Sequence, residues 1–269
     1  MSRKNKTQNI SDTQQGLYAE KKSKFLAILT CIFCFALCIT LADLFSTIIT
    51  VGSFSGGSGG KINSYSIFAV TLYQSPVKSS ATEHSIAVKK TNGAGYVWEN
   101  DEIFYVIASA YKEENDANKV KENLADSNYN VEVVKISIDE IVISKNYTSE
   151  ELTSLLSAGN LFKETFKSLY DISISLDTEI ISETQCRLEI SNLQSEVGKV
   201  KNNFEVMFNA KLSPTLLQLK LSINSVSTLI QQLIDFGESS SQQFSSKIKY
   251  NYIEILSINQ KLAKQINTI

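Results

Sequence analysis

Three cysteines near the N-terminus are spaced in a way that could hold a metal ion. Cys31, Cys34 and Cys38 are close enough in sequence to resemble the ligand pairs of zinc sites. They lie inside a long apolar run, without the polar neighbours that orient metal ligands. We therefore interpret them as small apolar residues and expect no metal site. Outside this run only Cys186 remains, so we expect no disulfide in the rest of the chain.

A glycine-rich stretch, Gly52–Lys61, has the composition of a phosphate-binding loop but lacks its pattern. Ser55 stands where such a loop needs its first glycine, and Ile62 stands where it needs Ser or Thr. We interpret the stretch as a flexible linker and expect no nucleotide.

Residues suited to acid–base catalysis are few. His84 is the only histidine, and neither an HExxH nor a GxSxG motif occurs. The carboxylates Glu113, Glu114 and Asp116 cluster where a helix is expected to begin, and there they stabilise the helix dipole. The sequence therefore predicts a protein that is not an enzyme and that carries no cofactor.

Two segments with the alternation of β-strands each precede a helix. Apolar residues alternate through Tyr65–Tyr73 and Glu102–Ala110. Helical spacing follows in Ala81–Lys90 and in a segment that Asn115 or Asp116 can cap, and Val131–Ile138 is again extended. Two such β-α-β halves predict an α+β, ferredoxin-like (split βαβ) domain: one antiparallel sheet with two helices on one face.

Parts of this region resemble a known family. The segments AVTLY (Ala69–Tyr73), GAGYVW and FYVIASAYKEENDANKV (Phe104–Val120) are similar to the SPOR domain, and the resemblance covers roughly residues 62–138. It implies a ferredoxin-like module that binds peptidoglycan and favours glycan strands stripped of their stem peptides. Many members carry Gln in the first strand, where this chain has Thr71.

Alternation along the strands predicts a core face and an open face. The residues expected to face the helices are Phe68, Val70, Leu72, Phe104, Val106 and Ala108. The opposite face mixes rings with hydroxyl groups, which suits the apolar faces and polar edges of sugars, and the resemblance places glycan binding on that face. The predicted glycan-binding residues are Ala69, Thr71, Tyr73, Trp98, Tyr105, Ile107, Ser109 and Tyr111, and Tyr96 could extend the set. The alternative is that these are ordinary strand residues that only pack.

The N-terminal part has the features of a membrane anchor. Residues 1–24 form a basic tail, and Phe25–Val51 is apolar apart from Ser, Thr and Asp43. This run exceeds the roughly 20 residues needed to span a bilayer and is too long for the core of a signal peptide. We therefore expect a transmembrane helix at residues 25–51, with a cytoplasmic N-terminus, and a linker at residues 52–61. The formal net charge of −2 gives no support for nucleic-acid binding.

The C-terminal half has helical periodicity. After an extended connector at residues 139–147, Thr148 or Ser149 starts a helical region that runs to residue 269. Four helices are expected, at about 149–176, 178–209, from Ser213-Pro214 to before Gly237, and 239–267. The short breaks between them favour an all-α bundle or helical hairpins, and a coiled coil with other chains is the alternative.

These features together predict a bacterial protein with a single-pass membrane anchor that binds peptidoglycan outside the cytoplasmic membrane. The resemblance implies a role in cell division, at the septum, or in sporulation, and the helical region would dock proteins of those processes. One alternative is a regulatory subunit that positions a cell-wall hydrolase. Another is a helical membrane adaptor without glycan binding.

Overall fold

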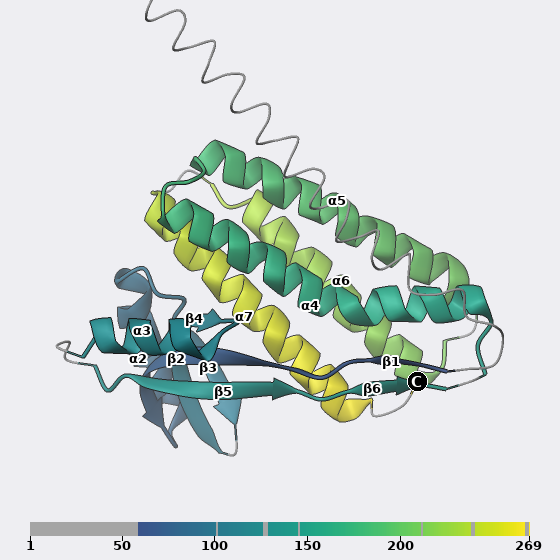
Figure 1. Ribbon diagram of the computed structural model, residues 1–269, viewed down its shortest axis with the longest axis horizontal. Coiled ribbons are helices and arrows are strands. Elements are labelled where there is room, and N and C mark those ends of the chain that lie inside the picture. Colours follow the sequence, from purple (N-terminus) through teal and green to yellow (C-terminus); the bar gives the residue numbers. More distant parts are fainter. Residues whose placement is uncertain are drawn as a thin grey trace, which may run out of the picture. The chain divides into compact units, whose positions relative to one another are not determined.

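The computed structural model describes residues 59–269, apart from residues 101, 126–128, 145, 211, 238–239 and 267–268. This part of the chain contains six strands and six helices (Figure 1). The first half holds β1 (Gly60–Ile62), β2 (Tyr65–Ser75), α2 (Lys78–Lys90), β3 (Tyr96–Asn100), β4 (Ile103–Tyr111), α3 (Glu114–Asn123), β5 (Glu132–Ile138) and β6 (Ile141–Ile143). The second half holds α4 (Ser149–Asp177), α5 (Glu183–Phe208), α6 (Pro214–Ile234) and α7 (Ser241–Gln265).

Four strands form an antiparallel sheet in the order β3-β4-β2-β5. One face of this sheet packs against α2 and α3. The buried residues of that cluster are Val70, Leu72, Ala81, Val88, Val106, Ala108 and Ala117. The core face expected from the alternation therefore does meet the two short helices.

The pairing of β2 with β4 is irregular. The register shifts between Val70 and Thr71 and again between Thr71 and Tyr73. Such irregularities change the direction in which the following side chains point, and this matters for Tyr73 below.

β1 and β6 form a second, two-stranded antiparallel sheet. Gly60 and Lys61, expected in the linker, are therefore part of a strand. Ile269 continues the pairing: its N–H donates to the carbonyl of Val142, and its carbonyl accepts from the N–H of Ser144. β1 packs against α4, where Ile62 lies directly over Gly159.

We expect Gly159→Ala to destabilise the fold, because the added Cβ would meet Ile62 Cγ1 at 2.6 Å and Ile62 Cδ1 closer still. Overpacking of this kind costs about 1–3 kcal/mol. Gly198→Ala, on α5, is the matched control. Its Cβ would meet nothing within 4 Å, so we expect a gain of about 0.5–1 kcal/mol. Urea unfolding of both variants checks the prediction, and equal effects would contradict it.

The four long helices begin largely where their caps predict. Thr148 caps α4 in a capping box: its hydroxyl accepts from Glu151 N at 3.2 Å, and Glu151 Oε2 accepts from Thr148 N at 2.8 Å. Ser213 caps α6, with Pro214 as its first residue. The predicted start of α5 at 178 is wrong, because Glu179 has a positive φ of 58° and Ser182 is the cap. The predicted cap of α3 is wrong too: Glu113 precedes the helix without a side-chain cap bond, and Asn115 and Asp116 lie in its first turn.

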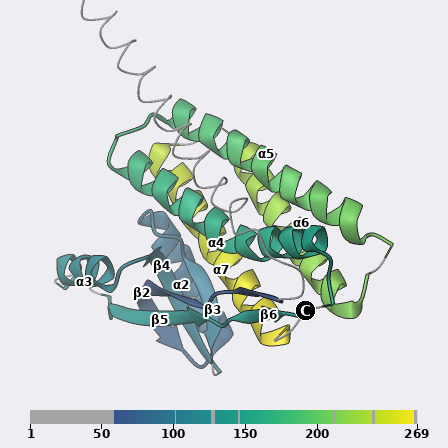
Figure 2. The ribbon, with the colours of Figure 1, turned by 45° about the vertical axis from the view of Figure 1, so that its right-hand side comes forward.

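The second face of the four-stranded sheet is covered by α7. α7 contacts β3, β4 and β5, and it runs across the strands in both views (Figures 1 and 2). Tyr252 of α7 is fully buried, and its hydroxyl lies 3.3 Å from Ala110 N and 3.4 Å from Ala110 O. Asn259 donates to the Tyr65 hydroxyl at 2.9 Å. One hydrophobic core therefore joins this sheet face to the helices.

The predicted fold class is wrong. The sequence predicted a ferredoxin-like domain with one open sheet face, placed between a transmembrane helix and a separate helical region. The described residues instead form six helices and two small sheets within one compact unit. The physical reason is that the second sheet face is apolar enough to be buried by α7. The transmembrane segment expected at 25–51 lies outside the described residues, and none of the described helices combines the length and apolarity needed to cross a bilayer.

Candidate functional site

Most of the predicted glycan-binding residues lie in the interior. Ala69, Thr71, Trp98, Ile107 and Ser109 are each at most 9% exposed. The expectation that they line an open face is wrong, because α7 packs over this side of the sheet. A ligand could reach these five residues only if this helix moved away.

Two further predicted residues are engaged elsewhere. The Tyr73 ring stacks on His84 of α2 with centroids 3.6 Å apart, and its hydroxyl lies 2.8 Å from Ser80 Oγ. Tyr73 therefore faces α2, opposite to its predicted side, as the register shifts in β2 explain. Tyr111 packs edge-on against Tyr170 of α4.

The last predicted residue, Tyr105, is partly exposed and belongs to a row of four rings. It pairs across the strands with Trp98. The Trp98 ring lies 6.3 Å from that of Tyr96, which lies 5.1 Å from the ring of Tyr250 on α7. We call these residues (Tyr250, Tyr96, Trp98 and Tyr105) the aromatic row. Two of its rings, Tyr96 and Trp98, lie on β3, which is an edge strand of its sheet.

The aromatic row combines apolar rings with neutral hydroxyl groups. Burial raises the pKa of Tyr96 to about 12, while a hydrogen bond with Ser257 acts in the opposite direction. Burial also raises the pKa of Tyr250. Both phenols therefore stay protonated near neutral pH and can donate as well as accept hydrogen bonds. Partly exposed rings with such groups can pack against the C–H face of a sugar and bond its hydroxyl groups.

Groups that could support catalysis are not gathered in the described part of the chain. His84 is exposed and stacked on Tyr73. Asp116 pairs with Lys119 on the same turn of α3. Cys186 is fully buried, and burial raises the pKa of its thiol to about 12, so it is not a nucleophile at neutral pH. Among the described residues, no three His, Cys, Asp or Glu side chains are grouped to hold a metal ion. Cys31, Cys34 and Cys38 lie outside the described residues.

No family model, curated protein or solved structure matches this chain. The resemblance to SPOR domains therefore rests on the quoted segments alone. Function has to be argued from the site and its chemistry, not from the fold.

Sequence reasoning missed Tyr250, which lies far along the chain from the strands that it contacts. A signal was present in the sequence: Tyr250 lies one turn from Lys247 and one turn from Glu254, on the polar side of an amphipathic helix. A partly exposed ring among charged residues is unusual for a core position. Sequence periodicity does not show that this ring meets Tyr96.

Proposed function

We propose that this protein is a non-catalytic binding protein of the bacterial envelope that holds peptidoglycan glycan strands outside the cytoplasmic membrane. The observation that supports the proposal is the aromatic row, whose three tyrosines are partly exposed beside an edge strand. The expected anchor at 25–51 and a role in cell division or sporulation belong to the same proposal. The site differs from the one expected from the sequence: it lies at the border between the sheet and α7.

The proposal is tested by binding of the purified protein to sacculi. We expect binding to sacculi whose stem peptides have been removed by an amidase, and weaker binding to untreated sacculi. The double variant Tyr105→Ala with Tyr250→Ala should bind at least roughly tenfold more weakly, because loss of a central ring contact costs about 1–3 kcal/mol. Melting curves should show that the variant is folded.

Tyr147→Ala is the matched control, because Tyr147 is also partly exposed but packs on Phe208 of α5. It should bind like the wild type. If the double variant also binds like the wild type, the aromatic row is not the site. If the wild type binds neither preparation, the proposed function is wrong.

A helical adaptor is the second candidate function, and the covered sheet face favours it. Near the junction of α5 and α6 the structure exposes apolar side chains: Val206 is 86% exposed, Leu221 50% and Leu217 43%. A groove of about 370 Å³ lies between α4 and α5, where Val200, Val206 and Met207 face Thr153 and Ser157. The adaptor function would be favoured if the wild type captures an envelope protein, the Val206→Glu variant does not capture it, and neither binds sacculi.

A further inference from the structure

Two lysines from distant parts of the chain approach the same ring. Lys89 Nζ, from the last turn of α2, lies 4.6 Å from the centroid of the Tyr250 ring, and Lys247 Nζ lies 5.3 Å from it. The adjoining loop is held to α7 because Ser246 Oγ donates to the carbonyl of Gly93 at 2.7 Å. The two ammonium groups are therefore brought together by the tertiary fold.

The backbone beside this pair is closely fitted. Gly95 has a φ of +57°, and a Cβ there would meet the carbonyl oxygen of Ser85 and, at 2.6 Å, Lys89 Cγ. Ser85 Oγ donates to the carbonyl of Gly95 at 2.7 Å. This turn keeps the stem of Lys89 against the loop that contacts α7.

The ion pairing of Lys89 and Lys247 differs from that of a third lysine, on α7. Neither Lys89 nor Lys247 forms an ion pair with any described residue, whereas Lys249, on the same helix, pairs with Asp177 at 2.6 Å. Burial lowers the pKa of Lys89, and repulsion from Lys247 lowers it further. The charge of Lys247 lowers the pKa of Glu254, which lies one turn beyond Tyr250, but burial has the larger effect and raises this pKa.

The tyrosine ring compensates only part of this repulsion. A cation over an aromatic face gains about 0.5–1 kcal/mol at an exposed site, and two cations share this ring. All three side chains are reachable from solvent, since Lys89 is exposed and Lys247 and Tyr250 are partly exposed. An anion bound near both ammonium groups would relieve their repulsion.

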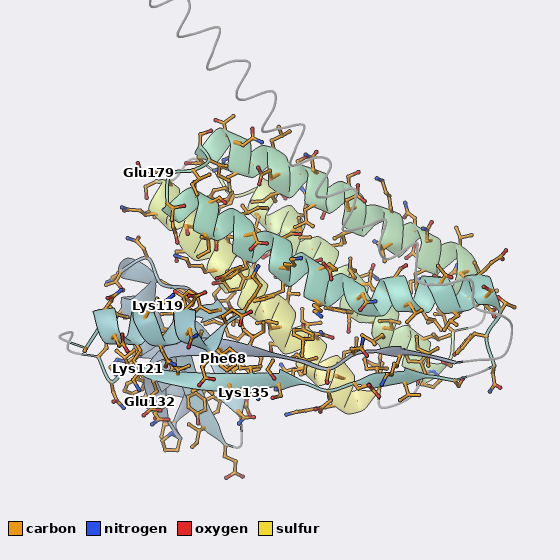
Figure 3. All side chains as sticks on the ribbon, in the orientation of Figure 1. Phe68, Lys119, Lys121, Glu132, Lys135 and Glu179 are labelled. Carbon is orange, nitrogen blue, oxygen red and sulfur yellow. The ribbon has the colours of Figure 1, made fainter. Side chains whose placement is uncertain are left out.

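Among the described residues, the other rings that a lysine approaches have one lysine each, as Phe104, Tyr170 and Tyr65 do. Figure 3 labels Lys119 and Lys121 on α3 and Glu132 and Lys135 on β5. Lys119 pairs with Asp116 at 2.8 Å, and Lys121 lies in the last turn of α3, as Lys89 does in α2. Lys119 and Lys121 therefore provide a matched control for the pair on Tyr250.

We propose that Lys89, Lys247 and Tyr250 form a binding site for an oxyanion carried by a sugar polymer of the cell wall. This rests on the proposed function and specifies its ligand: the sugars lie on the partly exposed tyrosines of the aromatic row, and their acid group lies at its Tyr250 end. The acid has two possible sources. One is the sugar carboxylate that becomes free when a stem peptide is removed, and the other is the phosphate of a wall polymer.

The anion site is tested first with inorganic phosphate, in the absence of cell-wall material. Melting temperatures are measured in sodium phosphate and in sodium chloride of equal ionic strength. A ligand that binds the folded state stabilises it, so phosphate should raise the melting temperature of the wild type above its value in chloride. The double variant Lys89→Gln with Lys247→Gln should lose this rise in melting temperature. The double variant Lys119→Gln with Lys121→Gln should keep it. An equal increment in all three proteins would overturn the site.

The source of the anion is tested on four preparations of sacculi, with and without amidase treatment and with and without removal of phosphate polymers by hydrofluoric acid. The double variant Lys89→Gln with Lys247→Gln should bind at least about tenfold more weakly than the wild type wherever the oxyanion is present. A loss on acid-stripped, amidase-treated sacculi assigns the carboxylate, and a loss confined to unstripped sacculi assigns the phosphate. If phosphate stabilises the wild type but no sacculi bind, the anion site stands and the wall polymer is overturned as its ligand.

Discussion

Tyr252→Ala is expected to destabilise the protein by about 3–5 kcal/mol, the range found when a buried aromatic side chain is removed from a core. Tyr252 is 1% exposed and packs edge-on against Phe166, with centroids 5.4 Å apart. Its hydroxyl also lies against the backbone of Ala110 in β4. The substitution removes contacts of α7 with both α4 and the sheet. Chemical unfolding, followed by circular dichroism, measures the loss.

Two further variants make this result specific. Tyr252→Phe keeps the ring but removes the hydroxyl that accepts a hydrogen bond from the N–H of Ala110. We expect this variant to lose less stability, about 1–3 kcal/mol. Leu217→Ala, at an exposed position of α6, should change stability by no more than about 0.5 kcal/mol. If Tyr252→Ala unfolds like the wild type, the sheet and the helices do not share one core.

Alkaline pH is expected to unfold the protein cooperatively. Burial raises the pKa of Tyr170 from 10.0 to about 12 and that of Cys186 from 9.0 to about 12. Because both pKa values are higher in the folded state, the folded protein holds these protons more tightly than the unfolded chain. The associated stability is fully present below about pH 9 and is lost as the pH rises toward 12.

Both shifts act in the same direction, so their effects on stability add as the pH rises. Urea midpoints measured between about pH 8 and pH 12 should fall steadily. The Cys186→Ala variant should have a lower urea midpoint at about pH 8, and its midpoint should fall less steeply as the pH rises. A flat profile in the wild type would contradict the expected direction of both shifts.

Local structure was largely predictable from the sequence. The period-2 alternation around Phe104 and Val106 predicted β4, and the spacing of Leu216, Leu219 and Ile223 predicted α6. Caps such as Thr148 and Ser213 depend on neighbouring residues only, so they too can be read from a short segment. These features are local, and the physical forces behind them act over a few residues.

The site was less predictable, because its geometry depends on contacts between distant segments. Alternation gives two faces for β4 but does not say what covers each of them. Ile107 and Ala110 on the second face are apolar, and strands buried on both faces are typically apolar on both. This composition favoured a covered face over an open one. The direction of Tyr73 depends on register shifts that only pairing with β4 reveals.

The position of α7 over the sheet has a consequence for how the chain reaches its native state. The hydrogen bonds that join α7 to the first half span 123 to 194 residues of sequence. During synthesis, Ile67 and Ile107 emerge from the ribosome long before the helix that will cover them. Folding dominated by such long-range contacts is slow, and uncovered apolar strands aggregate readily. We expect newly made chains to need chaperone protection until α7 is complete, and chains truncated before Ser241 to be removed by proteases.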